Sequence, residues 1–375
     1  MKKKFLCVLA LALCTFSLVA CGKDDEPEVE YVQPEIEAIP TAAPEVVEET
    51  AETVEEPKED ELPAGMYFSE LTHLPIDEAL KDQRPIAVMV DNEKTALPHF
   101  GLNDCDIIYE IMNSTQNDRI TRFMCIMKDY DKIEQLGSIR STRPTNILLC
   151  AEYNAVLCHD GGPFYIDAYF GKEVFKDHFS GIFSRVDNGK AREFTEYILP
   201  GDLDKAFKNS GFSKTYTEYY PGQHFQFAPK CDPLTFEDEE LAISATYIDL
   251  PFKHNGSELE YNEADKKYYY SEYGGPHNDA KTGEQLCFDN VIIQNCTFTQ
   301  LDEHGYLIYN VIDAGKAGYY CTNGKAIPIT WAKGGEDNSI TRYYDTVTGE
   351  EIKINTGKTY ITIIPSDSWE DVVIK

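Results

Sequence analysis

An unbroken apolar run, Ile86-Ala87-Val88-Met89-Val90, stops at the polar pair Asp91-Asn92. Five apolar residues bounded by a turn signal predict a buried strand. Strand-like and helix-like segments then alternate as far as Gly211, an order that predicts an N-terminal α/β layered domain over residues 64–235. We expect strands at 106–112, 119–127, 136–140 and 155–158, and helices at 144–152, 164–170 and 202–210. The last helix has Asp202 as its expected N-cap and Gly211 as its C-cap.

The pattern changes after about residue 236, where helical periodicity nearly disappears. Turn signals such as Asn323-Gly324 separate runs rich in β-branched and aromatic residues, as in antiparallel hairpins. We predict a mainly antiparallel β-rich domain over 236–375, and the α+β class for the whole chain. The expected strands cover 243–252, 259–270, 291–299, 306–312, 326–331, 341–345 and 359–364.

The first 63 residues lie outside this folded part. Residues 1–21 combine three lysines with a short apolar run that ends in Leu18-Val19-Ala20-Cys21, the pattern of a lipoprotein signal peptide with its lipobox. Cys21 is then the lipidated residue, and two acyl chains would anchor it stably. The alternative is an ordinary signal peptide with an accidental cysteine. Residues 22–63 hold 16 acidic residues, two lysines and six prolines, which predicts a disordered tether, or alternatively an acidic docking segment.

Charge and cysteine usage narrow the range of functions. The 375 residues carry 34 Lys+Arg against 65 Asp+Glu, a net charge of −31, and no basic patch suited to nucleic acid. Eight of the 11 cysteines lie beyond Cys21, without a CxxC pair or zinc-type spacing. Most of these eight lie in apolar runs, which favours buried thiols over disulfides.

An anion site is predicted where a strand gives way to a helix at residues 137–144. Arg140 and Arg143 flank Ser141 and Thr142, and Pro144 suits the first helical turn. Forked guanidinium donors beside the positive end of a helix suit phosphate or carboxylate. The alternative is that both arginines form structural salt bridges with the many acidic residues.

Two further residues join the candidate anion site. Arg122 lies inside an otherwise apolar strand and needs a partner, for which Glu110 and a bound anion are both candidates. His159 begins a glycine-rich loop at the end of a strand, where ligand sites of α/β sheets often lie, although a plain tight turn also fits.

A metal site is a second expectation. Asp106 and Glu110 share one face of a predicted strand and could hold a divalent cation such as Mg²⁺, or orient the arginines. The alternative is a solvated strand face. The chain lacks the GxSxG, HExxH, P-loop and GxGxxG motifs of common hydrolases and nucleotide enzymes.

Over residues 67–369 the chain resembles the YerB-like lipoproteins of Gram-positive bacteria. The resemblance rests on the segments 84–92, 101–102, 106–110, 120–123, 137–144 and 161–163, and further on 290–293, 324–325, 331–333 and 357–361. It implies a two-domain lipoprotein and supplies no reaction. A weaker similarity, over about 106–168, is to the LytR-CpsA-Psr envelope proteins, which transfer polymers from polyprenyl pyrophosphate. The aspartate expected after that family's arginine is replaced here by Ser141.

Together these patterns predict a lipoprotein on the outer face of the cytoplasmic membrane that binds an anionic, phosphorylated envelope ligand. The β-rich domain is expected to bind a partner in the envelope. A non-catalytic scaffold of the cell-wall synthesis machinery is the alternative. Catalysis is the least favoured, and would be that of a phosphotransferase or hydrolase acting on an envelope pyrophosphate.

Overall fold

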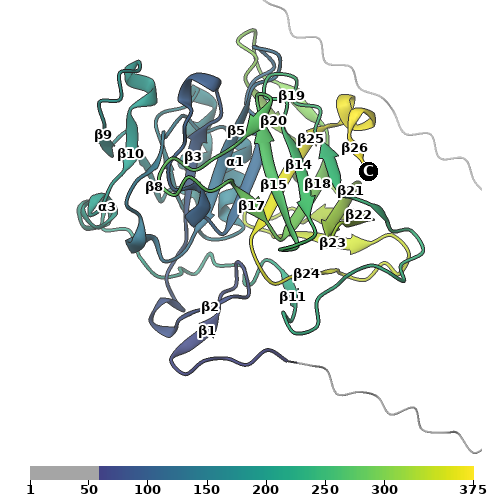
Figure 1. Cartoon of the computed structure of the whole chain (residues 1–375). Coiled ribbons are helices and arrows are strands. Elements are labelled where there is room, and N and C mark those ends of the chain that lie inside the picture. Colours follow the sequence, from purple (N-terminus) through teal and green to yellow (C-terminus); the bar gives the residue numbers. More distant parts are fainter. Residues whose placement is uncertain (1–58) are drawn as a thin grey trace, which may run out of the picture. The chain divides into compact units, whose positions relative to one another are not determined.

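The apolar run at 86–90 forms β3 (Ile86–Asp91), whose six residues are all buried. In this computed structural model, which describes residues 59–375, β3 lies inside a large mixed sheet (Figure 1). It pairs antiparallel with β5 (Thr121–Met127) and parallel with β7 (Val156–His159). The prediction of a buried strand is confirmed here. Residues 1–58, which include Cys21 and most of the predicted tether, lie outside the described residues.

The central sheet has eleven strands and continues across the predicted boundary near residue 235. Its two halves join where β25 (Thr359–Pro365) pairs parallel with β4 (Ile107–Met112). On the β4 side, β5, β3 and β7 lead to β8 (His178–Ser180). On the β25 side the order is β18 (Asn290–Cys296), β21 (Ala314–Thr322), β22 (Lys325–Lys333) and β12 (Ile243–Ser244), with β23 (Thr341–Asp345) also paired to β22.

A second, antiparallel sheet of six strands covers one face of the central sheet. The Tyr270 ring packs between Phe123 of β5 and Tyr360 of β25, with centroids 5.7 Å away in both cases. The opposite face carries α1 (Pro144–Ala151), where the hydroxyls of Tyr109 and Tyr153 lie 2.8 Å apart. The covering sheet consists of β16 (Gly275–Pro276), β15 (Lys267–Glu272), β14 (Glu258–Asn262), β13 (Tyr247–Asp249) and β26 (Val373–Ile374), with β17 (Cys287–Phe288) beside β15.

Smaller elements complete the fold. The short sheets are β1 (Met66–Phe68) with β2 (Pro75–Asp77), β6 (Leu136–Gly137) with β10 (Glu196–Ile198) and β9 (Ser184–Arg185), β11 (Gln226–Ala228) with β24 (Lys353–Asn355), and β19 (Phe298–Gln300) with β20 (Leu307–Tyr309). The other α-helices are α2 (Asp167–Phe170) and α3 (Asp202–Ser210). The 3-10 helices are η1 (Glu78–Leu80), η2 (Lys94–Ala96), η3 (Leu102–Asp104), η4 (Tyr130–Lys132), η5 (Phe164–Ile166), η6 (Glu173–Phe175), η7 (Arg192–Phe194) and η8 (Ser366–Asp371).

The described residues form many strands and few helices, and their sheets are mixed or antiparallel apart from the parallel pair β11 and β24, which fits the α+β class. The finer α/β layering of 64–235 and the boundary at 235 stay predictions. Helix α3 has the expected bounds and Gly211 as its C-cap, but its N-cap is Gly201. The expectation for Asp202 was wrong because its carboxylate accepts instead from the backbone amides of Leu199 and Ser184.

Two other secondary-structure elements differ from the prediction. The predicted helix at 164–170 is divided between η5 and α2, and β21 was not predicted. Its first half contains Gly315 and Gly318, which interrupt the run of β-formers that marks a strand. The eight described cysteines are free thiols, of which six are buried, Cys287 is half-buried and Cys231 is exposed. Among residues 59–375 we find no helix with the length and apolar character to cross a membrane.

Candidate functional site

The predicted anion-binding segment forms a loop between β6 and α1, at the ends of two neighbouring strands. The Arg140 amide donates to the carbonyl of Met89 in β3, and the Arg140 carbonyl accepts from the amide of Asp160, just after β7. The Thr142 amide donates to the Gly161 carbonyl. Arg143 is the N-cap of α1 and Pro144 its first residue, as predicted. The loop is therefore fixed by backbone bonds on both sides.

Arg122 and Arg143 both donate to the hydroxyl group of Ser141 in this loop. Nη1 of Arg122 donates to the Ser141 Oγ at 3.0 Å and to the Ser141 carbonyl at 2.6 Å. Nη1 of Arg143 donates to the same Oγ at 3.1 Å. Asn113 links the pair further, because its side-chain oxygen accepts from Arg122 and its carbonyl from Arg143. The ring of Tyr306 covers the Arg143 guanidinium at 4.7 Å.

Both guanidiniums are buried without a carboxylate partner. Arg122 is 5% exposed and Arg143 7% exposed. Within residues 59–375, no carboxylate oxygen lies within 4.0 Å of either side chain's nitrogens. Burial lowers the pKa of Arg122 to about 10, and burial together with the charge of Arg122 lowers the pKa of Arg143 to about 9. Both remain charged at neutral pH.

The other buried lysine and arginine side chains of the described residues are each paired with a carboxylate. Lys128 pairs with Glu70 at 2.7 Å, Lys333 with Glu152 at 3.1 Å, and Arg84 with Asp177 at 2.6 Å. Arg122 and Arg143 are therefore the exceptions in this part of the chain.

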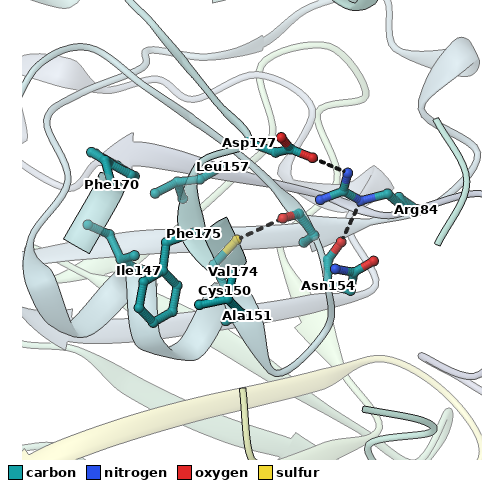
Figure 2. A pocket seen from close by; sticks show the side chains of 11 residues that line it. Arg84, Ile147, Cys150, Ala151, Asn154, Leu157, Phe170, Val174, Phe175 and Asp177 are labelled. Carbon is teal, nitrogen blue, oxygen red and sulfur yellow. Dashed lines mark hydrogen bonds and ion pairs between the residues drawn. The ribbon is translucent and has the colours of Figure 1, made fainter. Parts of the chain in front are cut away.

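Arg84 is the closest comparison because it is an equally buried arginine (Figure 2). Its Nε donates to the Asn154 carbonyl at 2.8 Å, and the carboxylate of Asp177 neutralises its charge. The adjoining cavity, lined by Ile147 and Phe170 among others, is about 20 Å³, room for about one water molecule. Arg84 thus serves the fold.

Arg140 is saturated by acidic residues, in contrast to its neighbours. Its Nε lies 2.5 Å from the Asp91 carboxylate and its Nη1 2.8 Å from that of Glu193. Asp91 lies directly opposite Arg122 in the β3–β5 ladder, so Arg140 takes the carboxylate that Arg122 could have used. The predicted salt-bridge alternative thus holds for Arg140, whereas Arg122 and Arg143 have no such carboxylate partner among the described residues.

His159 and Thr142 support the loop and offer little to a ligand. The His159 Nδ1 lies 2.8 Å from the Gly161 carbonyl and its Nε2 2.9 Å from Nδ1 of His178, so both nitrogens are used. Burial lowers the pKa of His159 to about 4, which keeps the ring neutral. Thr142 is fully buried, and its hydroxyl donates to the Arg143 carbonyl.

Asp106 and Glu110 do not meet at one metal ion. The two residues are four positions apart along the same extended segment. At the usual rise of a strand, their Cα atoms are therefore roughly 13 Å apart. Asp106 accepts from the Lys128 amide, and burial raises its pKa to about 6. Glu110 is fully buried on the face under the second sheet, where it accepts hydrogen bonds from the side chains of Asn92, Thr121, Ser257, Tyr270 and Tyr360.

Glu110 is also not the partner of Arg122. The ladder sets Ile111 opposite Arg122 and Phe123 opposite Glu110, so the two charged side chains project from opposite faces of the sheet. The carboxylate therefore cannot orient the arginines, and the expectation that it does was wrong.

The arrangement leaves three donors for a ligand. The Ser141 oxygen accepts from both guanidiniums, so its own proton is free to donate outward. The Nη2 groups of Arg122 and Arg143 make no hydrogen bond within the described residues. Asn113 and Tyr306 complete the site and were not predicted, since nothing in the sequence near either residue marks it.

Comparisons with known proteins agree with this fold. The model for the N-terminal domain of a family described as "Protein of unknown function (DUF3048)" matches residues 71–213, and the model for its C-terminal domain matches 248–361. The protein named "Putative lipoprotein YerB" of Bacillus subtilis (strain 168) is 23% identical over 387 aligned residues, covering 99% of this chain and 96% of that protein. The crystal structure of YerB from Bacillus subtilis has a TM-score of 0.66 at 21% identity, over 82% of this chain and 99% of that one.

The resemblance to the YerB-like proteins is thereby confirmed over both halves of the chain. The weaker resemblance to LytR-CpsA-Psr proteins finds no support in these comparisons.

Proposed function

We propose a function for this chain, which belongs to the DUF3048 family of two-domain proteins: it binds a phosphorylated, anionic ligand of the cell envelope through Arg122, Arg143 and Ser141. One observation carries the proposal. Two neighbouring guanidiniums are buried with no carboxylate within 4.0 Å, whereas each of the other buried lysine and arginine side chains between residues 59 and 375 has one. A buried charge is costly unless paired, so an exogenous anion is the natural partner.

The donor set favours a phosphoryl group. Two guanidinium edges and one hydroxyl can meet several oxygens of one tetrahedral anion, and charge-assisted bonds of this kind are the strong ones. Helix α1 begins directly after Arg143, so the positive end of that helix adds to the attraction for an anion. The proposal is one of binding, with no turnover.

The proposed location of the protein follows from its predicted signal peptide. We propose that Cys21 carries the lipid and anchors the folded part to the outer face of the cytoplasmic membrane. The name of the similar Bacillus subtilis protein, a lipoprotein, supports the anchor. A polyprenyl-linked phosphate or pyrophosphate is then a ligand of the right charge in the right place.

Calorimetric titration of the purified protein in detergent tests the binding. Pyrophosphate and a polyprenyl phosphate serve as probes, each with and without Mg²⁺. We expect the wild type to bind at least one probe, and the charge-preserving pair Arg122→Lys with Arg143→Lys to lose at least tenfold in affinity, because lysine lacks the fork. Arg342→Lys is the matched control, since Arg342 is a partly exposed arginine that pairs with Glu351.

Two results would contradict the proposal. One is equal affinity in the lysine pair and the wild type. The other is no binding of either probe at millimolar concentration, which would favour the non-catalytic scaffold.

A further inference from the structure

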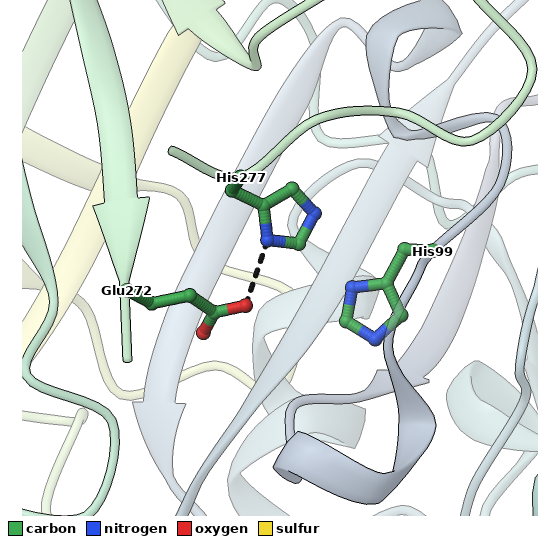
Figure 3. Close-up of side chains that lie close together, drawn as sticks. All are labelled: His99, Glu272 and His277. Atoms are coloured by element: carbon green, nitrogen blue, oxygen red, sulfur yellow. Dashed lines mark hydrogen bonds and ion pairs between the residues drawn. The ribbon is translucent and has the colours of Figure 1, made fainter. Parts of the chain in front are cut away.

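Three buried side chains from distant parts of the chain lie together under the second sheet (Figure 3). His99 comes from the loop between η2 and η3, Glu272 ends β15, and His277 directly follows β16. Their exposed fractions are 0%, 3% and 4%. One ligand atom from each lies within 4.8 Å of those of the other two.

The hydrogen bonds within the cluster are incomplete. Nδ1 of His277 lies 2.7 Å from Oε1 of Glu272. Nε2 of His277 has no partner, and neither nitrogen of His99 has one. A neutral imidazole carries one proton and one lone pair, and burying both without partners is unfavourable. Figure 3 shows the two rings and the carboxylate close together, with one nitrogen of the His99 ring on the side of the His277 ring.

The charge of the cluster is also uncompensated. Among residues 59–375 no lysine or arginine nitrogen lies within 4.0 Å of the Glu272 carboxylate, and only His277 does. The Tyr270 hydroxyl connects Glu272, at 3.4 Å, with the fully buried carboxylate of Glu110, at 3.0 Å. Two buried carboxylates thus share one network that holds no fixed positive charge.

A second buried histidine–glutamate pair shows what is missing. His224 and Glu152 are in contact at 2.9 Å and are equally buried. There Lys333 lies 3.1 Å from Glu152 and supplies the cation. The Glu272–His277 pair has a second histidine, His99, in place of the lysine, and a histidine with a free lone pair is a metal ligand.

We propose that His99, Glu272 and His277 bind one divalent transition-metal ion, for which Zn²⁺ is the best fit. Two imidazole nitrogens and one carboxylate oxygen suit Zn²⁺ and its neighbours in the first transition series better than Mg²⁺ or Ca²⁺, which prefer oxygen alone. The ion neutralises Glu272 and uses the lone pairs that the fold leaves unpaired.

The position of the ligands gives the ion a structural role. His99 belongs to the N-terminal half, whereas Glu272 lies in the second sheet of the C-terminal half and His277 directly follows that sheet's strand β16. Binding would thus tie the loop at residue 99 to β15 and β16, and because a site of this kind does not exist in the unfolded chain, metal affinity adds directly to stability.

Metal analysis and cobalt spectroscopy of the purified protein in detergent test the proposal. We expect about one equivalent of Zn²⁺ after purification without chelator. After chelator treatment, added Zn²⁺ should raise the midpoint of thermal unfolding, and added Co²⁺ should give visible d–d bands. His99→Gln should abolish the bands and weaken Zn²⁺ affinity at least tenfold, because it removes one of three ligands.

His224→Gln is the matched control, since it alters the comparable buried pair that already has its lysine. It should keep the bands and the Zn²⁺ response. Either of two findings would overturn the proposal: wild-type protein that takes up neither Zn²⁺ nor Co²⁺ at 100 µM, or His99→Gln that binds as tightly as the wild type. Circular dichroism of each variant shows that it has folded. Neither readout depends on the anion site, so failure of one proposal leaves the other standing.

Discussion

Replacing Arg143 with methionine should stabilise the protein when no anion is present. Burial and the charge of Arg122 lower the pKa of Arg143 from 12.5 to about 9. Since one pKa unit corresponds to about 1.4 kcal/mol, keeping this guanidinium charged in the folded state costs on the order of 4–5 kcal/mol. Methionine keeps much of the packing and removes that cost.

The loss of hydrogen bonds offsets part of the gain. Arg143 donates to the Asn113 carbonyl, the Ser141 hydroxyl and the Thr142 carbonyl, each worth about 1 kcal/mol net. The expected result is an increase of about 1–2 kcal/mol in the free energy of unfolding. For a chain of this size that raises the thermal midpoint by roughly 2–6 °C.

Scanning calorimetry in a buffer free of phosphate and sulfate measures this midpoint. Arg84→Met is the matched control, because it leaves the half-buried carboxylate of Asp177 without its cation and should lower stability by about 2–4 kcal/mol. With pyrophosphate added, the order of wild type and Arg143→Met should reverse, since only the wild type gains from binding. If Arg143→Met is destabilised as much as Arg84→Met, the guanidinium is structural and the reasoning fails.

Three further outcomes are expected. Glu110→Leu removes the acceptor of several buried hydroxyl and amide groups. The free energy of unfolding, measured in urea, should decrease by about 3–5 kcal/mol. A decrease under about 1 kcal/mol would contradict the hydrogen-bond network around Glu110. Burial lowers the pKa of His159 to about 4, below its unfolded value of 6.5. As the pH falls from 6.5 to 4, the free energy of unfolding of the wild type should therefore decrease by about 3 kcal/mol more than that of His159→Gln. Parallel pH profiles of the two proteins would exclude this. Gly357 has φ +134°, and a Cβ atom added there would lie 2.2 Å from the Asp289 side chain, whereas one added at Gly349 would meet open space. Gly357→Ala should therefore lower the thermal midpoint by several degrees more than Gly349→Ala. Equal midpoints would show that the chain around Gly357 adjusts freely.

Local patterns in the sequence predicted the local structure well. The apolar run at 86–90, the helix at 202–210 with its Gly211 cap, and Pro144 at a helix start all follow from interactions within a few residues. The joining of both halves into one sheet could not be predicted. It depends on the parallel pairing of β25 with β4, some 250 residues apart, and no short-range signal encodes that pairing.

The same limit applies to charged residues. The sequence indicated that Arg122 needs a partner, and that Asp106 and Glu110 share a face, but not which residue of β5 stands opposite Glu110. A slip of one residue in this ladder would have put Arg122 and Glu110 together, because side chains alternate between faces. Likewise His99 and His277 are 178 positions apart, so no spacing motif could reveal their contact.

The register of β4 and β5 explains why the two proposed ion sites lie on opposite faces of one sheet. Thr121 and Arg122 are neighbours in β5 and point to opposite faces. Thr121 donates to Glu110 on the face that also holds Glu272, while Arg122 joins Arg143 on the other. The backbone of the sheet keeps the buried carboxylates and the unpaired guanidiniums apart, so they cannot neutralise one another. In the two proposals each face takes a counterion from outside the chain, and the proposed ligands therefore have opposite charges: an anion beside Ser141 and a metal cation beside His99.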